Sequence, residues 1–242
     1  MQHIFFRLFL PLLAFSLLPA HGDVPGKTNG LNAPQRVSGY QITDENGKPL
    51  SLFSPAAYRA EFRYLRRIGH RIDLGGAPVP TDGWTDNIPD VEWPFMQFCY
   101  FGYACVNLAK YDSELRPDAL AEVRWLIEAL QTPRLSGFMT ANFGDPFDDK
   151  KIHASAFVHG HFLNLTLRYR EVSGDGRYDG LIHRVAAALA EQYSKTDQAI
   201  LGSYKTMWWL TDNFPVMSAL SRYDAAFSRN TSQDKKHAAH QC

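Results

Sequence analysis

The spacing of apolar residues along the chain predicts helices that come in pairs. Between about 116 and 131, apolar residues recur every three or four positions among charged neighbours, which is typical of an amphipathic helix: Leu120, Val123, Leu126, Ile127 and Leu130. The stretch 91–111 is apolar nearly all round, which indicates a helix buried on every side. Little of the chain alternates between apolar and polar residues, so few strands are expected.

A second helical pair is predicted at the centre of the chain, with helices at about 152–172 and 178–195. The connection between them contains Gly174 and Gly176, and glycine suits the positive φ at a helix C-terminus. The first of these helices, from His153 to Tyr169, carries three histidines among apolar residues. We expect the polar residues near the ends of this hairpin to carry the function.

Two further helices and two loops complete the predicted order of elements. One helix starts with Ser54 as N-cap and runs to about residue 68, and the last runs from Pro215 to about 227, with Asp212 or Asn213 near its cap. Segments 75–89 and 135–151 are rich in turn residues and are predicted to be loops. After residue 227 the chain becomes polar and loses its periodicity.

These elements predict an all-α fold, an α/α toroid-like array of helical hairpins with about six helices. A closed toroid of six hairpins needs about twice as many helices, so the array is expected to be incomplete. It would be half of a barrel that pairs with another chain, an open array, or a truncated gene product. The predicted helical domain covers residues 54–227, between a flexible lead-in (23–53) and a polar tail (228–242).

The first 22 residues predict a secretory signal peptide. Arg7 precedes an apolar stretch from Leu8 to Leu18, and the small residues Ala20 and Gly22 suit a cleavage site before Asp23. An uncleaved N-terminal anchor is the alternative. No later stretch reaches ~18 uninterrupted apolar residues, so a periplasmic or secreted protein with no membrane contact after cleavage is expected.

Charge and cysteine content narrow the classes of function. The 25 basic and 25 acidic residues balance, which gives no reason to expect nucleic acid as a partner. Cys99 and Cys105 are interpreted as small buried hydrophobic residues, and the pairing of Cys242 stays open. The chain has no Gly-rich phosphate loop and no Gly-x-Ser-x-Gly motif, so nucleotide-dependent chemistry and serine hydrolysis lack support.

The central segment offers candidate acids and bases. His161 is a candidate general acid or base because imidazole titrates near neutral pH, the alternative being a hydrogen-bonded core histidine. His159 lies two residues before it, ~200° around a helix, so the two cannot bind one metal ion, and neither a metal nor another cofactor is expected. Asp145 stands in a cluster of carboxylates and is a candidate general acid, or part of a solvated loop.

The stretch 204–213, YKTMWWLTDN, is the richest in aromatic and polar residues. Tyr204, Trp208 and Asn213 are candidates for binding a small-molecule substrate, since aromatic faces suit a sugar or an apolar ligand. Asp212 is a candidate second acid or base. Its alternative role is to cap a helix, as aspartate often does.

Three groups of motifs between residues 95 and 224 resemble linalool dehydratase/isomerase and similar α/α-barrel proteins. FCYFGYACVNL at 98–108, followed by Leu115-Arg116, is similar to the first inner helix of that family. The second group is FGDPF at 143–147, then Gly160-His161, Gly174 and Arg177-Tyr178. The third is Asp212-Asn213 with Tyr223-Asp224. The resemblance implies an exported, cofactor-free enzyme that adds or removes water at an allylic alcohol by acid–base chemistry.

The chain also departs from the motifs of this family at several positions. Tyr103 matches the inner-helix tyrosine and is a candidate substrate-binding residue, but Met96-Gln97 stands where acidic residues are expected. Ser203 and Asp212 stand where the family places cysteines. The dehydratase activity itself is therefore not carried over.

Three hypotheses follow for the function. The first is an exported enzyme that uses cofactor-free acid–base chemistry, like a hydro-lyase or a glycosidase. The second is a non-enzymatic helical module that binds a partner, including a second copy of itself, through an exposed apolar edge. The third is a truncated, inactive relative. Self-association favours the second, and turnover that depends on His161 and Asp212 favours the first.

Overall fold

The structure is a computed structural model that describes residues 54–75, 92–197 and 200–239, with side chains as far as residue 227. The predicted signal peptide (1–22), the predicted lead-in (23–53), most of the predicted loop 75–89, and Cys242 lie outside these residues. The chain divides after Arg71 into two compact units. The first unit contributes one described helix, α2 (Pro55–Gly69), which begins as predicted, because the Ser54 side chain accepts a hydrogen bond from the backbone N–H of Ala57 at 3.2 Å.

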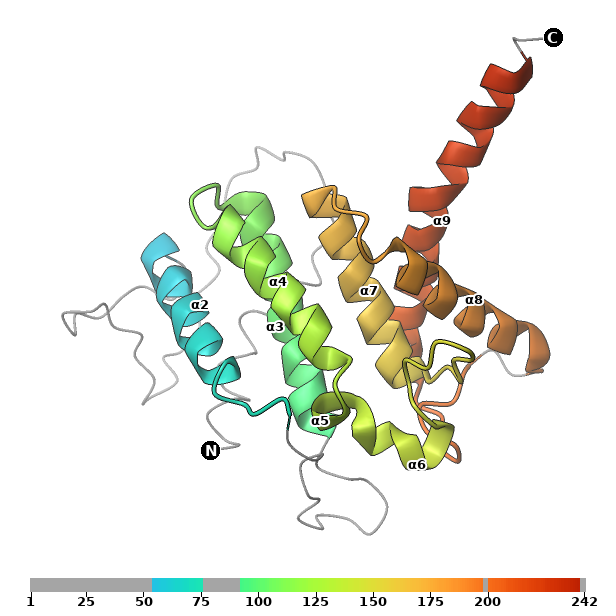
Figure 1. Ribbon diagram of the computed structural model, residues 1–242, viewed down its shortest axis with the longest axis horizontal. Coiled ribbons are helices and arrows are strands. Elements are labelled where there is room, and N and C mark those ends of the chain that lie inside the picture. The colour runs from blue at the N-terminus through green and yellow to red at the C-terminus, as the bar shows by residue number, and fades with distance from the viewer. Residues whose placement is uncertain (1–53, 76–91, 198–199, 240–242) are drawn as a thin grey trace, which may run out of the picture. The chain divides into compact units, whose positions relative to one another are not determined.

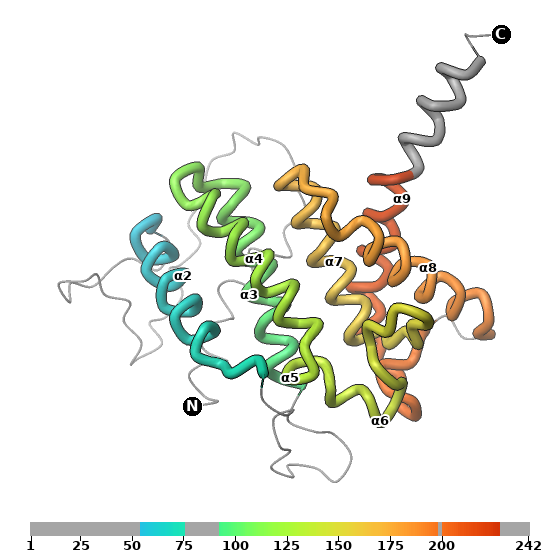
Figure 2. Tube along the Cα trace, viewed as in Figure 1, coloured from blue at the N-terminus to red at the C-terminus, as the bar shows by residue number. Residues whose placement is uncertain are grey.

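The second unit is built from five long helices, joined by short helices, turns and loops, and its described residues contain no strand beyond an isolated bridge between Tyr204 and Met207. Figures 1 and 2 trace these helices in chain order: α3 (Glu92–Tyr111), α4 (Arg116–Leu130), α7 (Ala156–Ser173), α8 (Asp179–Lys195) and α9 (Leu210–Ala239). The prediction of an all-α protein is confirmed. None of the helices among the described residues has the length and apolar character needed to cross a membrane.

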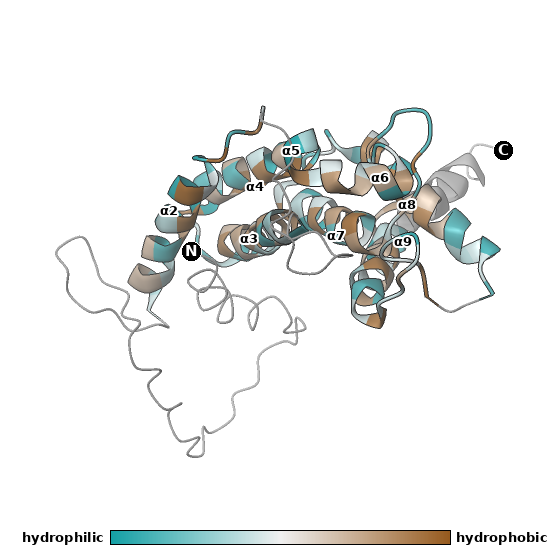
Figure 3. Cartoon of the chain, turned by 90° about the horizontal axis from the view of Figure 1, so that it is seen from below, coloured by the Kyte–Doolittle hydropathy of each residue, from teal (hydrophilic) through white to brown (hydrophobic). Residues whose placement is uncertain are grey.

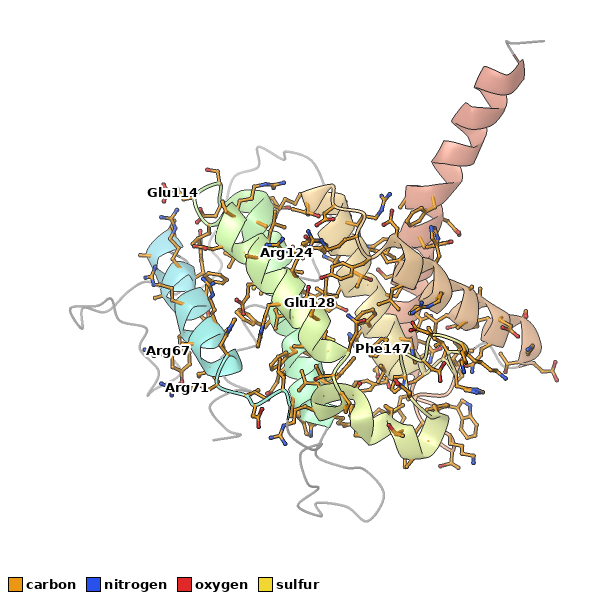
Figure 4. The ribbon with its side chains drawn as sticks, in the orientation of Figure 1. Arg67, Arg71, Glu114, Arg124, Glu128 and Phe147 are labelled. Atoms are coloured by element: carbon orange, nitrogen blue, oxygen red, sulfur yellow. The ribbon has the colours of Figure 1, made fainter. Side chains whose placement is uncertain are left out.

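In the second unit, α3, α7 and α9 pack side by side in one layer, and α4 packs over α3 and α7 (Figure 3). Within its layer α7 packs against both α3 and α9, and each hairpin closes through contacts of α3 with α4 and of α7 with α8. The hydroxyl of Tyr178, just before α8, also donates a hydrogen bond to Glu128 of α4 (3.1 Å; Glu128 is labelled in Figure 4).

Helix α7 forms the centre of this arrangement, with 13 of its 18 residues buried. It starts where the Ser155 hydroxyl accepts a hydrogen bond from the backbone N–H of Val158, and it ends at Gly174, whose φ is +73° as predicted. A Cβ atom at Gly160 would lie 2.6 Å from Cγ2 of Val216 in α9, and one at Gly102 would lie 2.7 Å from Cδ1 of Leu165. Glycine thus allows the close approach of α3, α7 and α9.

Two predicted boundaries around the centre of the chain are wrong. Helix α7 begins at Ala156, not at 152, because Ser155 caps it, so His153 lies outside the helix and is exposed. The segment 135–151 is not only loop, since the chain forms three short helices there: α5 (Pro133–Ser136), the 3-10 helix η1 (Gly137–Met139) and α6 (Thr140–Phe143). Helices of three or four residues are too short to show a period in the sequence.

The last helix is longer at both ends than predicted. Helix α9 starts at Leu210 and contains Pro215 in its interior, so Asp212 and Asn213 lie in its first turn and do not precede it. The helix also continues past residue 227, where the prediction ended it, to Ala239 in the polar tail. Apolar periodicity detects helices that bury a face, whereas this tail is polar and shows no such period, so the sequence pattern did not indicate a helix there.

Candidate functional site

The candidate site centres on Tyr103 of α3 and His161 of α7. The Tyr103 hydroxyl donates a hydrogen bond to the backbone carbonyl of His161 at 2.9 Å, and it lies 3.2 Å from Nδ1 of the same residue. Both side chains are buried, with exposed fractions of 6% and 4%. Two residues 58 positions apart in the sequence therefore form one hydrogen-bonded pair between two helices of the same layer.

The geometry of this pair determines the tautomer of His161. The tyrosine has one proton, and its carbonyl partner can only accept, so we infer that Nδ1 of His161 carries a proton and donates it to the tyrosine oxygen. The lone pair then belongs to Nε2, to which no described residue hydrogen-bonds. Burial lowers the pKa of His161 from 6.5 to about 4, so the ring is neutral at pH 7. A neutral ring with an open Nε2 suits a proton acceptor.

Aromatic rings surround His161 and account for its low pKa. Tyr100 meets the imidazole edge-on with ring centres 5.6 Å apart, and Phe157 does the same at 5.8 Å. The Tyr103 ring lies at 6.2 Å. These rings replace water around the imidazole, so the charged form loses its hydration.

Asp212, in the first turn of α9, is the carboxylate of the site. It is 4% exposed, and its Oδ2 atom is buried without a hydrogen-bond partner among the described residues. Burial raises its pKa, and a hydrogen bond from Ser203 opposes that rise. Burial also raises the pKa of Tyr100 to about 12, with Cys99 and the negative charge of Asp212 adding to the effect. Asp212 therefore lies close enough to Tyr100 to interact with the ring that covers His161.

Two more polar residues of α7 belong to the same face as His161. Asn164 and Arg168 follow it by three and seven residues, which places all three side chains on one face of the helix. Asn164 hydrogen-bonds the Tyr103 hydroxyl, and the Arg168 guanidinium lies 5.6 Å from the centre of the Tyr103 ring. Neither residue was predicted from the sequence, and nor was Tyr100. The signal was there, because polar residues at i, i+3 and i+7 in an otherwise apolar helix share a face.

The predicted acid Asp145 is not brought into this site. It is exposed, and its carboxylate accepts a hydrogen bond from the backbone N–H of Phe147 at 2.9 Å. The ring of Phe147, which is labelled in Figure 4, packs instead against that of Phe162 on α7, with ring centres 4.6 Å apart. The neighbouring Asp148 binds backbone N–H groups, and Asp149 pairs with Arg184 at 3.0 Å. The carboxylates of this loop thus organise the loop and face solvent.

Asn213, predicted to bind substrate, is used entirely in holding the chain together. Its Oδ1 atom accepts hydrogen bonds from the Tyr193 hydroxyl and from the backbone N–H of Leu201, both at 2.8 Å. Its Nδ2 atom donates to the backbone carbonyls of Leu201 at 3.1 Å and Trp209 at 3.0 Å. With the side chain fully buried, no group remains for a ligand. It fixes the segment before α9, and with it the position of Asp212.

The two other predicted substrate-binding residues differ in their accessibility. Tyr204 is buried, its hydroxyl donates a hydrogen bond to Glu92, and its ring stacks on Phe157 at 6.2 Å. It therefore supports a ring that lines His161, and its hydroxyl is occupied. Trp208 has an exposed fraction of 50%, so it offers a face to a ligand.

His159 has a structural role. Its Nδ1 accepts a hydrogen bond from the backbone N–H of Ser155 at 2.8 Å, and its Nε2 donates to the carbonyl of Pro146 at 2.7 Å. Both ring nitrogens are thus occupied. Across the described part of the chain, no three His, Cys, Asp or Glu side chains are grouped so as to hold a metal ion.

The site therefore consists of a neutral histidine, a tyrosine bonded to it, a buried carboxylate, and an amide and a guanidinium on the same helix face. Such a set can transfer protons and bind polar groups. Comparison with family models, with curated proteins and with solved structures gave no match to this chain, so any assignment of function rests on the site itself.

Proposed function

We propose that the protein is an exported, cofactor-free enzyme that adds water to, or removes it from, a small organic molecule by acid–base chemistry. The observation that carries the proposal is that Tyr100 meets His161 edge-on at 5.6 Å and that the charge of Asp212 also raises the pKa of Tyr100. Burial shifts the pKa of His161 and that of Asp212 toward the neutral form of each group. A hydro-lyase is favoured over a glycosidase, because glycosidases use two carboxylates and this site has one.

The neutral forms are the ones that elimination of water requires. Asp212, in the protonated form that burial favours, donates its proton to the hydroxyl group of the substrate, and the C–O bond breaks with release of water. Nε2 of His161 takes a proton from the adjacent carbon, whose electron pair forms the double bond. The imidazolium is then stabilised by the Nδ1–H bond to the Tyr103 oxygen, and the proton returns to Asp212 through solvent.

The reaction class can be tested without knowing the natural substrate. The protein is incubated in ¹⁸O-labelled water with a panel of alkenols and of nitrophenyl glycosides. The masses of the products are then measured by mass spectrometry. A hydro-lyase places ¹⁸O in recovered alkenol and forms a diene, whereas release of nitrophenol indicates glycoside hydrolysis.

The residue assignment is tested with matched variants. His161→Ala and Asp212→Asn should abolish turnover with helicity retained in circular dichroism, whereas Asp145→Asn, the same change in an exposed carboxylate, should leave it unaltered. Activity that survives both site variants would show that the assignment is wrong. Export is tested separately by the intact mass of the protein recovered from cells, which is expected to match a chain that begins at Asp23.

A second candidate function, partner binding, is favoured by an exposed apolar strip next to the site. Leu210, Phe214 and Met217 recur at i, i+4 and i+7 on α9 with exposed fractions of 58%, 58% and 60%, and Trp208 and Trp209 precede them. We name these five residues the α9 strip. Large side chains at such exposures offer on the order of 500 Å² of surface. Two copies that pair through the strip would bury about 1,000 Å², the lower limit for a specific interface.

A further inference from the structure

Arg168 is a half-buried cation whose guanidinium forms no hydrogen bond or ion pair with a described residue. Its Nε atom is buried without a hydrogen-bond partner in this part of the chain. Its described contact is with the face of the Tyr103 ring, 5.6 Å from the ring centre. Withdrawing a cation from water without compensation is costly, so a guanidinium held in this way is suited to receive a negative charge from a ligand.

A second guanidinium lies on the same side of α7. Arg222 of α9 pairs with Glu171 at 2.8 Å, and Glu171 follows Arg168 by one turn of α7. The Nε atom of Arg222 is also buried without a partner among the described residues. In agreement with this placement, burial lowers the pKa of Arg168 and the positive charge of Arg222 lowers it further. Two cations thus share one carboxylate, which leaves an excess positive charge between α7 and α9.

Asn164 adds a polar group between this charge and the histidine. Its Oδ1 atom is buried without a partner among the described residues, so it is free to accept a hydrogen bond from a ligand hydroxyl. Along α7, Arg168 is seven residues from His161, a distance of about 10 Å along the helix axis. A ligand that lies along α7 would therefore contact a base at His161, a hydrogen-bond acceptor at Asn164 and a cation at Arg168.

We propose that Arg168 and Arg222 bind an oxyanion, a carboxylate or a phosphate group, carried by the small substrate of this site. The planar guanidinium groups match the paired oxygens of such an anion. The inference rests on the proposed function insofar as the ligand is called a substrate. The anion subsite itself is independent of turnover.

The test is a titration of the whole protein with inorganic phosphate and, separately, with acetate, at constant ionic strength set with chloride. The nitrogen–proton signal of Arg168 Nε is followed by NMR. At least one anion should shift the signal saturably, and acetamide, which is neutral and of similar shape, should not. A response to acetate alone indicates a carboxylate substrate, and a response to phosphate alone indicates a phosphorylated one. Absence of any saturable shift would overturn the proposal.

Variants separate the subsite from general charge effects. Arg168→Gln should weaken anion binding roughly tenfold or more, as expected for loss of a hydrogen bond to a charged group. Binding is then read from the Arg222 Nε signal. Arg184→Gln is the control, since this arginine lies on α8 and pairs with the exposed Asp149. Equal losses in both variants would contradict the proposal. Anion binding without turnover of any substrate would retain the subsite and remove the proposed enzyme activity.

Discussion

At the scale of single residues, burial shifts the pKa values of the titratable groups in the site. Removing a titratable group from water favours its neutral form, so burial lowers the pKa of His161 and raises that of Asp212. One environment therefore produces both an unprotonated base and a carboxyl group that keeps its proton more readily. Enzymes that run acid and base steps at one pH often separate their groups in this way.

The buried histidines should make stability depend on pH. His159 and His161 each have a folded pKa of about 4 against an ordinary value of 6.5, so the unfolded chain binds more protons between these values. Their stabilisation is full above pH 6.5 and is lost as pH falls toward 4, by about 3 kcal/mol each. The raised pKa of Asp212 acts in the opposite direction at the lower end of this range.

Thermal melts between pH 4 and pH 7 measure this effect. The Tm should fall steadily on acidification, and the slope should be shallower in His161→Gln, which removes one titrating group but keeps a polar side chain. A Tm that does not change over this range would mean that the histidines are not buried in the neutral form.

Tyr103→Phe isolates the hydroxyl that joins α3 to α7. The change leaves Nδ1 and the carbonyl of His161 without their partner, so unfolding in urea should show a loss of about 1–3 kcal/mol. Turnover, where the ¹⁸O assay detects it, should fall as well. Tyr111→Phe is the control: its ring is 72% exposed, and a change within about 0.5 kcal/mol is expected. Equal effects in both variants would argue against the buried pair.

At the scale of helices, the close contact of α7 with α9 depends on Gly160. An added methyl group would meet Cγ2 of Val216 at 2.6 Å and its backbone nitrogen at 3.1 Å, so Gly160→Ala should destabilise the fold by about 1–3 kcal/mol. Gly180→Ala is the matched control on α8, where nothing lies within 4 Å of the new atom, and it should be neutral or slightly stabilising. The double variant Gly160→Ala/Val216→Ala should recover part of the loss. Chemical denaturation of the wild type and of these three variants gives the free energies of unfolding that test this prediction.

The long helices could be predicted from the sequence because each buries a face with a clear period. The boundaries of α3, α4 and α8 agree with the prediction to within a residue or two. The short helices of 133–143 were not predicted, because they are stabilised by the burial of Leu135 and Met139 and not by a periodic apolar face. Asn213 shows a further limit, since its four hydrogen bonds depend on a loop that returns to it twelve residues away. Likewise, the sequence does not distinguish Asp145 from Asp212, because only the fold buries Asp212 and leaves Asp145 exposed.

At the scale of the whole molecule, the α9 strip predicts self-association. Dimers should appear as protein concentration rises in sedimentation experiments, and Phe214→Ser combined with Met217→Lys should yield monomers with unchanged helicity. Tyr111→Ser, which alters an exposed ring at the end of α3, is the control and should not affect association. A wild-type protein that stays monomeric at all concentrations would count against partner binding through this strip.

Pro215 has a consequence for access to the site. Proline has no N–H, so the carbonyl of Thr211 receives no backbone hydrogen bond from four residues ahead, and the first turn of α9 is joined to the rest by an interrupted ladder. Side-chain hydrogen bonds from Asn213 hold this turn in place. Such a turn can open locally at a lower free-energy cost than unfolding of the helix. Asp212 would move with it while His161 stayed fixed in α7, which gives a molecule from solvent a route to a histidine that is otherwise enclosed.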